Sequence, residues 1–312
     1  MKLFDEKGYV RRTCPQCNRA YWTLDPNSAT CGDQPCTPYG FLDNPPTNRR
    51  YTTTEIREMF LSFFEEHQHA RIRKYPVLAR WRDDVFFVGA SVYNFQPWVT
   101  EGIIPPPANP LTISQPCIRL TDIDLIGKTG RHLTSFEMMA HHAFNTRDHR
   151  VYWTDETAAY CFEFFTERLG VKPEKINFVE DMWVGGGNAG EDLEVVIDGI
   201  EVSTLVFMHY KMLNGNLKPI DNLTVDTGYG LERIAWLSNG APTIYNAIFQ
   251  PVVTQLVKAA NLTPPSPRVL VEVSKAAGQL KSEGSHDLRV ARAETAAQLG
   301  LQPEELDKKL RP

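Results

Sequence analysis

Residues 225–236 read VDTGYGLERIAW, and this stretch decides which fold the chain can adopt. Two glycines flank a tyrosine, and a mainly apolar run follows them. Glycine allows sharp turns and close approach of other groups to the backbone. We therefore expect a glycine corner followed by a helix over Leu231–Leu237. Two opposite charges, Asp226 and Arg233, lie on either side of the corner. The question is which groups these two side chains bind.

The composition is that of a soluble globular protein with one large domain or two smaller ones. The 312 residues are 42% hydrophobic and 23% charged, with a net charge of −5. This balance disfavours a protein that grips nucleic acid over its whole surface. No apolar run approaches the length of a membrane span. The N-terminus, MKLFDEKGYVRR, lacks the apolar core of a secretory signal, so we expect a cytoplasmic protein.

Four cysteines crowd the N-terminal region, in the stretch TCPQCNRAYWTLDPNSATCGDQPC. Cys14 and Cys17 form a C-x2-C pair, and Cys31 and Cys36 form a looser C-x4-C pair thirteen residues later. Two short knuckles with two thiolates each are typical of a closed tetrahedral zinc site. The alternative is four free cysteines in a loop. Clustered cysteines in a reducing compartment favour Zn²⁺.

The rest of the chain mixes amphipathic helices with short extended segments, which predicts an α+β domain. A capping box at Thr52 and Glu55 begins a helix whose apolar residues recur at helical spacing. A polar loop over Thr121–Gly130 joins two expected strands into a long hairpin. The other expected elements are extended pieces at Asp84–Phe95, strands at Ile118–Leu120, Arg131–Met138, Ile176–Val179, Leu193–Ile197 and Val202–Tyr210, a helix at Thr154–Leu169 capped by Thr154, a helix at Pro251–Ala260, and a helical tail from Leu270.

Several of these residues together suggest a nucleotide site. An aromatic ring at Phe136 and the guanidinium of Arg233 can sandwich a flat heterocycle, and Arg119 can bind a phosphate. Glu137 or Glu194 can hold a divalent metal against a polyphosphate. The set would bind ATP without a phosphate loop, and the glycine-rich GGGNAG does not match the dinucleotide fingerprint. Taken singly, each residue could instead be a paired arginine, a core aromatic or a turn cap.

A family resemblance makes the pattern specific. Arg119, a loop and a strand bearing Phe136 resemble motif 2 of class II aminoacyl-tRNA synthetases, and GYGLER at Gly228–Arg233 resembles motif 3. The helix at Glu55–His69 resembles motif 1. From about Val10 onward, the phrases SQPCIRLTDID, GRHLTSFEMMAHHAF, MWVGGGNAG, TLVFMHYK and VDTGYGLERIAW are similar to the archaeal form of the alanyl-tRNA synthetase family. The resemblance implies the class II antiparallel sheet flanked by helices.

The resemblance also implies roles for individual residues. Around ATP, Arg119 would bind the α-phosphate, Phe136 and Arg233 would clamp adenine, Asp122 and Arg131 would line the site, and Glu194 would help to hold Mg²⁺. Around alanine, Asp226 would anchor the ammonium, while Trp183, Gly228, Thr204 and Val206 would shape a pocket for one methyl group. We interpret His141 and His142 as structural or supporting residues rather than catalysts.

The implied function is activation of alanine as alanyl-adenylate and its transfer to tRNA-Ala. We expect a zinc-knuckle segment over residues 1–48, the catalytic domain over 49–262 and a helical tail over 263–312. In the family, tRNA-recognition, editing and oligomerisation domains follow. The likeness runs to Pro312, where this sequence stops, so the main tRNA-recognition surface is expected to lie outside these residues.

Two alternatives remain open at this point. A stand-alone ligase would activate alanine or another small amino acid and pass it to a small molecule or carrier protein. A non-catalytic module would only bind an amino acid or a partner. Glu191 and His209 stand where the family pattern has proline and glutamine, which leaves room for a changed substrate.

Overall fold

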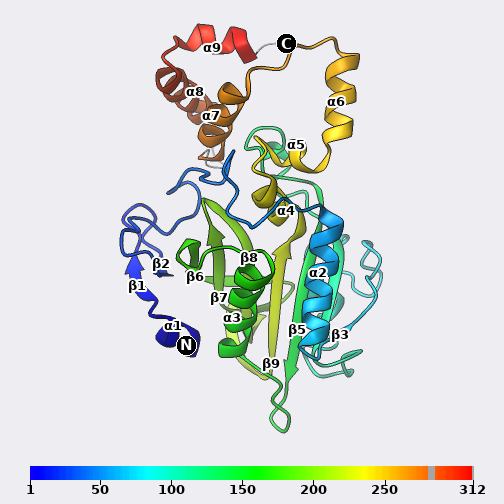
Figure 1. Ribbon diagram of the computed structural model, residues 1–312. Helices are drawn as coiled ribbons and strands as arrows, with labels where there is room; N and C mark the ends of the chain where they lie inside the picture. The colour runs from blue at the N-terminus through cyan, green and yellow to red at the C-terminus, as the bar shows by residue number, and fades with distance from the viewer. Residues whose placement is uncertain (280–284, 311–312) are drawn as a thin grey trace.

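A nine-stranded sheet organises the chain (Figure 1). The computed structural model describes residues 1–279 and 285–310. The strand order is β1-β2-β6-β7-β8-β9-β5-β4-β3. Among the described strand pairs, β3 and β4 run parallel and the others run antiparallel. The strands are β1 Val10–Thr13, β2 Ala20–Thr23, β3 Ala70–Arg71, β4 Leu111–Ile118, β5 Ser135–Asn145, β6 Ile176–Gly185, β7 Asn188–Ile197, β8 Ile200–Leu213 and β9 Asn216–Gly230. This confirms the α+β class and the antiparallel sheet.

Helices cover one face of the sheet and extend beyond one end of it. Figure 1 shows α2 and α3 lying across the sheet, with α6 and the group α7–α9 beyond the end that carries α4. The helices are α1 Lys2–Lys7, α2 Thr53–Glu66, α3 Thr154–Glu163, α4 Leu231–Asn239, α5 Ile244–Ile248, α6 Gln250–Ala259, α7 Pro267–Gly278, α8 Ser285–Leu299 and α9 Pro303–Leu310. The predicted helical tail is confirmed for its described part; residues 280–284 and 311–312 lie outside the described residues.

The main core lies between the sheet and these helices. The predicted capping box begins α2, because the Thr52 hydroxyl accepts a hydrogen bond from the Glu55 amide and the Glu55 carboxylate accepts one from the Thr52 amide. Phe60 and Phe64 of α2 are fully buried, and the ring of Phe60 lies 4.8 Å from that of Tyr229 on β9. Aromatic packing of this kind stabilises the helix on the sheet.

Side-chain alternation along the strands assigns each residue to one of the two faces. Tyr229 and its register partner Met139 point into the main core beneath the helices. Their neighbours Gly228, Gly230 and Met138 therefore lie on the opposite face, and all three line a cavity there. The open face of the sheet is where the candidate site forms.

The strands of the central hairpin differ from expectation. β4 runs over Leu111–Ile118, so it begins earlier than the expected strand at Ile118–Leu120 and accommodates Pro116. Proline is tolerated because β3 pairs with only the first two residues of β4, so the β3 pairing does not need an amide from Pro116. β5 begins at Ser135 rather than Arg131 and continues to Asn145, because the MMAHHAF stretch is buried strand rather than loop.

The glycine-rich stretch forms a hairpin turn and not a ligand loop. β6 and β7 pair through to Gly185 and Asn188, so Gly186 and Gly187, both with positive φ, make a tight connection. No strand was expected over β9, whose first half is polar and exposed. The signal that predicts β9 is the Asn214-Gly215 pair, both in the left-handed region, which is typical of a two-residue hairpin turn.

Two smaller expectations were also wrong or incomplete. Residues 84–95 hold a single isolated bridge, Leu78 to Phe87, and a 3₁₀ turn at Ser91–Asn94 instead of extended strands. The helix expected over Thr154–Leu169 is capped at Trp153 and changes to a π-helical turn after Glu163. β1 and β2 join the edge of the same sheet as β6, while the expected domain boundaries stay predictions.

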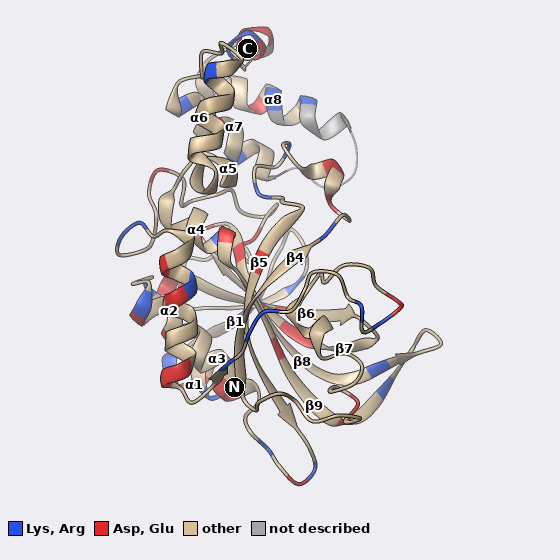
Figure 2. Ribbon diagram, turned by 90° about the vertical axis from the view of Figure 1, so that its right-hand side faces the viewer, with Lys and Arg blue, Asp and Glu red and all other residues tan. Residues whose placement is uncertain are grey.

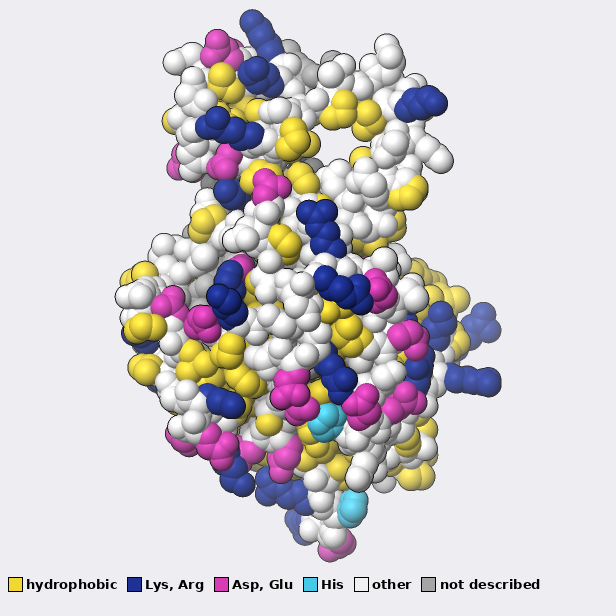
Figure 3. Space-filling model, viewed as in Figure 1, with side chains coloured by type: hydrophobic (Ala, Val, Ile, Leu, Met, Phe, Trp, Pro, Cys, Tyr) yellow, Lys and Arg dark blue, Asp and Glu magenta, His cyan; other side chains and the backbone are white. Residues whose placement is uncertain are grey.

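Charges of both signs are distributed over the surface. Figure 2 shows acidic and basic positions together on α2, and the face in Figure 3 intersperses Lys and Arg with Asp and Glu. This fits the small net charge of −5. Among the described residues, no helix combines the length and the apolar character needed to cross a membrane.

A substitution at Gly190 would test how closely the sheet packs beside the cavity. A Cβ at this position would lie 2.0 Å from the Phe207 carbonyl oxygen, which is backbone and cannot move freely. We expect Gly190→Ala to lower the free energy of unfolding by roughly 2 kcal/mol or more in urea denaturation. Gly40→Ala is the control, because its Cβ would meet Asp198 at 3.6 Å, an ordinary contact. Equal stabilities of the two variants would contradict such close packing at Gly190.

Candidate active site

The cavity on the open face collects residues from distant parts of the chain. It is lined from the β4–β5 connection, β5, β6, β8, β9 and α4. Ten of the eleven residues expected around ATP or alanine line it, and they are Arg119, Asp122, Arg131, Phe136, Trp183, Thr204, Val206, Asp226, Gly228 and Arg233. The structure thus brings these residues together, while their individual roles stay predictions.

Arg119 and Phe136 form one wall of the cavity. Arg119 follows the end of β4, and its guanidinium carbon lies 5.1 Å from the centre of the Phe136 ring. The Arg119 Nε donates a hydrogen bond of 2.7 Å to the Gly89 carbonyl oxygen, which fixes the side chain and leaves its other nitrogens facing the cavity lining. A ring and a cation held in this way present an aromatic face beside a phosphate-binding group.

Arg233 lies in the first turn of α4 and is held by Glu201. The Arg233 Nη1 donates to the Glu201 carboxylate at 2.9 Å and to the Glu201 carbonyl oxygen at 3.2 Å. Thr204 donates to the other carboxylate oxygen at 2.7 Å. Burial alone would raise the pKa of Glu201, but Arg233, the Thr204 hydroxyl and Arg119 together outweigh it, and the pKa lies below its usual value. Arg233 therefore has a fixed orientation before any ligand binds.

Asp226 is a buried carboxyl at the inner end of the cavity. It is 5% exposed, and burial raises its pKa from 3.8 to about 8 despite the opposing charge of Arg119. The Nδ1 of His142 lies 3.4 Å from its carboxylate, and the Nε2 of His142 lies 3.0 Å from the Ser91 hydroxyl. A carboxyl that is costly to ionise alone gains most from a bound cation such as an ammonium.

Small and apolar groups surround Asp226. Val206 is its register partner on β8, and Thr204 pairs with Gly228 in the same way. Trp183 packs against the apolar cluster that includes Val206. A Cβ on Gly228 would lie 3.0 Å from the sulfur of Met138, so glycine keeps this part of the cavity open. The space beside Asp226 suits a small side chain.

Glu194 is the expected ATP residue that the structure does not bring into the lining. Its carboxylate forms an ion pair with Arg19 instead. Glu137, the other carboxylate considered for a metal, accepts two hydrogen bonds from Arg57 at 2.6 and 2.8 Å. Both carboxylates are thus engaged by arginines.

The two histidines lie on opposite faces of β5. His141 is buried in the core, where its ring stacks on Phe64 at 4.2 Å and its Nδ1 lies 2.8 Å from the Tyr152 hydroxyl. Its position fits the structural interpretation. His142 faces Asp226. Glu191 and His209, which depart from the family pattern, pair with each other at 3.0 Å and do not line the cavity.

Two acidic residues of the cavity escaped the sequence interpretation. Glu201, the partner of Arg233, directly precedes the apolar run of β8, and its sequence neighbours give no sign of that partner. Glu232 lies within the quoted GLER phrase; its carboxylate accepts hydrogen bonds of 2.9 and 3.1 Å from the Glu137 amide. Burial raises the pKa of Glu232 to about 7. The wall near Arg233 is therefore richer in half-buried acids than the sequence indicated.

The four N-terminal cysteines also come together. We call residues 14–36 the cysteine knuckle. The sulfur atoms of Cys14, Cys17, Cys31 and Cys36 all lie within 4.8 Å of one another, and those of Cys17 and Cys31 are 3.8 Å apart. Tetrahedral zinc with Zn–S bonds of about 2.3 Å requires sulfur separations of about 3.8 Å. The described donor set therefore fits a Zn²⁺ ion.

An ATP-type cavity on an antiparallel sheet, with one arginine from a strand hairpin and one from a helix behind a glycine corner, defines a class II synthetase catalytic domain. The family model described as tRNA synthetases class II (A) matches residues 55–312, and the chain belongs to this family.

Curated relatives are similar over nearly the whole chain. Alanine--tRNA ligase of Pyrobaculum calidifontis is 56% identical over 90% of this chain and 32% of its own length. The proteins of that name from Thermofilum pendens and Pyrococcus furiosus are 52% and 50% identical over all of this chain and 34% and 36% of their lengths. The chain thus spans about a third of these relatives. Among solved structures, a pyrrolysyl tRNA synthetase from Desulfitobacterium hafniense matches 64% of this chain and 73% of its own at 15% identity, with a TM-score of 0.44.

The raised pKa of Asp226 predicts a distinctive pH dependence of stability. Between 3.8 and about 8 the folded protein keeps a proton that the unfolded chain has released, so Asp226 lowers the free energy of unfolding as the pH rises through this range. We expect Asp226→Asn to be more stable than the wild type at pH 8, with a difference that narrows toward pH 4. Urea denaturation at several pH values measures this.

Asp221→Asn serves as the matched control, because Asp221 lies on the same strand but is exposed and paired with Arg147. Its pH profile should follow that of the wild type. An Asp226→Asn profile parallel to the wild type would show that Asp226 is ionised in the folded protein and would contradict a raised pKa.

Proposed function

We propose that this chain activates alanine with ATP as alanyl-adenylate and serves the transfer of alanine to tRNA-Ala. The observation that carries the proposal is a single cavity in which a buried carboxyl, Asp226, faces the same space as Arg119, Phe136 and Arg233. An ammonium acceptor and a nucleotide clamp in one cavity bring two substrates together. The similarity to proteins named alanine--tRNA ligase supports alanine and tRNA-Ala as substrates.

The proposed reaction needs little covalent participation by the protein. A carboxylate oxygen of alanine attacks the α-phosphorus of ATP, the new O–P bond forms, and the bond from the α-phosphorus to the bridging oxygen breaks to release pyrophosphate. A carboxylate is already a nucleophile, so no base is required. Positioning and neutralisation of the developing charge dominate such a transfer. Arg119 would bind the α-phosphate, and Arg233 with Phe136 would clamp the adenine.

Asp122 and Arg131 complete the proposed nucleotide side of the cavity. Class II synthetases use Mg²⁺ with ATP, and the ion would offset charge on the phosphates when bound. Glu194 was expected to hold it, but the glutamates that line the cavity are Glu201, which Arg233 engages, and Glu232, which would offer carboxylate oxygens to the ion. Hard oxygen ligands of this kind suit Mg²⁺.

On the amino-acid side, Asp226 would take the ammonium group and become ionised as it does so. Trp183, Thr204, Val206 and Gly228 would enclose the methyl group. A larger side chain would meet the indole and the β8 residues, which favours the smallest chiral amino acid. Glu191 and His209 lie outside this lining, so their departure from the family pattern does not alter the pocket.

The acceptor and the location rest on the family. The relatives' names indicate tRNA as the acceptor, whereas no described feature favours a small molecule or a carrier protein. The six free cysteines and the class of enzyme support the cytoplasm as the compartment.

We also propose that the cysteine knuckle binds one Zn²⁺ through Cys14, Cys17, Cys31 and Cys36. The fit of the sulfur separations to tetrahedral coordination supports this, as does the burial of three of the four side chains. The ion would be structural, because four thiolates leave no open coordination position. It would hold the two cysteine pairs of the knuckle together at the edge of the sheet.

Asp226 provides the direct test of activation. In ATP–pyrophosphate exchange, the wild type should exchange with alanine, and Asp226→Asn should lose at least about a hundredfold in kcat/KM for alanine, because a neutral amide gives up the charge pairing with the ammonium. ATP binding measured by calorimetry should persist. Asp221→Asn should behave as the wild type. If Asp226→Asn exchanged at wild-type rates, Asp226 would not be the amino-acid anchor. If the wild type exchanged with no amino acid, the proposed function would be refuted.

The metal proposal has its own measurement. Protein purified with zinc present should contain about one zinc per chain by elemental analysis, and Cys17→Ser should lose most of it together with thermal stability. Cys161→Ser is the control, because Cys161 lies on α3 and packs in the main core rather than with the cysteine knuckle. Full zinc content in Cys17→Ser would contradict the site.

A further inference from the structure

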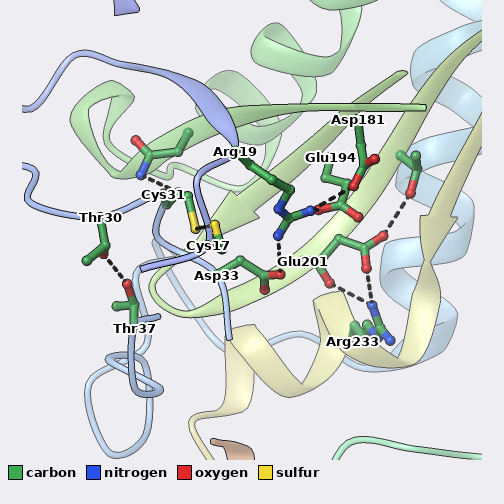
Figure 4. A network of polar contacts seen from close by, with 12 residues as sticks. Cys17, Arg19, Thr30, Cys31, Asp33, Thr37, Asp181, Glu194, Glu201 and Arg233 are labelled. Atoms are coloured by element: carbon green, nitrogen blue, oxygen red, sulfur yellow. Dashed lines mark hydrogen bonds and ion pairs between the residues drawn. The ribbon is translucent and has the colours of Figure 1, made fainter. Parts of the chain in front are cut away.

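A charged side chain connects the cysteine knuckle to the cavity wall. Arg19 lies two residues after Cys17, and its carbonyl oxygen accepts a hydrogen bond of 2.9 Å from the Cys14 amide. The turn that carries Cys14 and Cys17 therefore sets the position of Arg19. Asp33 lies between the two cysteines of the second knuckle. Figure 4 shows the Arg19 guanidinium between Asp33 on one side and the sheet carboxylates on the other.

Arg19 is the common partner of three carboxylates. It pairs with Glu194 on β7, with Asp181 on β6 at 3.1 Å and with Asp33 at 3.4 Å. The side chains of Arg19, Glu194 and Asp33 are only 26%, 21% and 15% exposed, so solvent screens these charges poorly. One cation thus offsets much of the negative charge gathered beneath this edge of the sheet.

Glu194 lies next to the carboxylate that holds Arg233. Its register partner on β8 is Thr204, and the Thr204 hydroxyl donates to Glu201. Burial and the neighbouring charge of Glu201 both raise the pKa of Glu194 and so disfavour its ionised form, and the paired Arg19 opposes both. Without Arg19, two carboxylates would compete in the same partly dry space, and the one that is coupled to Arg233 would be disturbed.

A continuous series of contacts therefore connects the cysteine knuckle to the proposed adenine site. Arg19 pairs with Glu194, Glu194 adjoins Glu201, and Glu201 pairs with Arg233 (Figure 4). The first two members lie outside the cavity lining, and the last two lie in it. A residue of the N-terminal segment can thus act on the adenine site without touching ATP.

We propose that Arg19 is a positioning residue for the ATP site, which neutralises Glu194 so that Glu201 can hold Arg233 in place for adenine. The cysteine knuckle then supports the nucleotide site, and Glu194 serves as the counter-ion of Arg19 rather than as a ligand of Mg²⁺. This inference rests on the proposed activation of alanine. It assigns the knuckle a function beyond its own folding.

The test uses a double-mutant cycle on the full 312-residue chain. Arg19→Met keeps most of the side-chain length without the charge, Glu194→Gln removes the orphaned carboxylate, and the double variant combines them. Arg11→Met is the matched control, because Arg11 also ties the N-terminal strands to β6, through Glu180, but does so away from the cavity. ATP–pyrophosphate exchange, calorimetric ATP binding and zinc content are measured for each.

Arg19→Met should raise the KM and Kd for ATP about tenfold, equivalent to roughly 1.4 kcal/mol, and should leave the KM for alanine within about twofold. The double variant should recover most of the lost ATP affinity, because Glu194→Gln removes the repulsion that Arg19→Met exposes. Arg19→Lys should fall between wild type and Arg19→Met, because one ammonium cannot bridge all three carboxylates. Zinc content should stay at the wild-type value, and Arg11→Met should bind ATP normally.

Several results would overturn the inference. These are an unchanged ATP affinity in Arg19→Met, an equal loss for alanine and ATP, a loss of zinc in both Arg19→Met and Arg19→Lys, or a double variant no better than Arg19→Met. Collapse of exchange in Glu194→Gln alone would also overturn it and would favour Glu194 as a Mg²⁺ ligand. Wild-type exchange, measured alongside, separates failure of this inference from failure of the proposed function.

Discussion

The pairing register of β9 with β8 and β5 is the constraint on which the site depends. Val206 lies opposite Asp226, and Met138 lies opposite Gly230, so Asp226 and the glycine corner share one face. Side chains alternate along a strand, and a slip of one residue would turn Asp226 into the aromatic core beneath α2. Tyr229, fully buried among those aromatics, fixes the register.

The cavity brings together a dense set of charges, from the buried Asp226 to the exposed Arg119. Arginines at positions 119 and 233 are oriented by the Gly89 carbonyl and by Glu201 respectively, before a ligand arrives. Asp226 and Glu232 have pKa values raised by burial, so each gains from a cation or proton that a ligand supplies. Preorganisation of this kind reduces the reorganisation that charge transfer to phosphate would otherwise require.

The sequence predicted those parts of the molecule that local patterns encode. The capping box at Thr52, the helix behind the glycine corner and the four-cysteine spacing each depend on residues that lie close in sequence. Of the ten expected residues that line the cavity, Arg119, Phe136 and Arg233 were suggested by their own chemistry, and most of the others were found only through the ordered family phrases. Most of β4 and the second half of β5 were missed, because the expected strands were placed at Ile118–Leu120 and Arg131–Met138.

What could not be predicted depends on contacts between distant segments. Arg19 and Glu194 are 175 residues apart, and nothing near either residue indicates the other. Glu201 likewise resembles any acid before an apolar strand until Arg233, 32 residues later, is brought beside it. Sequence pattern gives the type of a residue, but only the folded sheet decides whether its charge faces solvent, a counter-ion or a substrate.

The central claim is that Asp226 and the pair Phe136 and Arg233 hold two different substrates in one cavity. A crystal structure of the chain with a non-hydrolysable alanyl-adenylate analogue tests it most directly. We predict the ammonium of the analogue within hydrogen-bonding distance of the Asp226 carboxylate, the methyl group against Trp183, and the adenine between the Phe136 ring and the Arg233 guanidinium. An analogue bound with its adenine away from Arg233, or with its ammonium facing solvent, would contradict the claim.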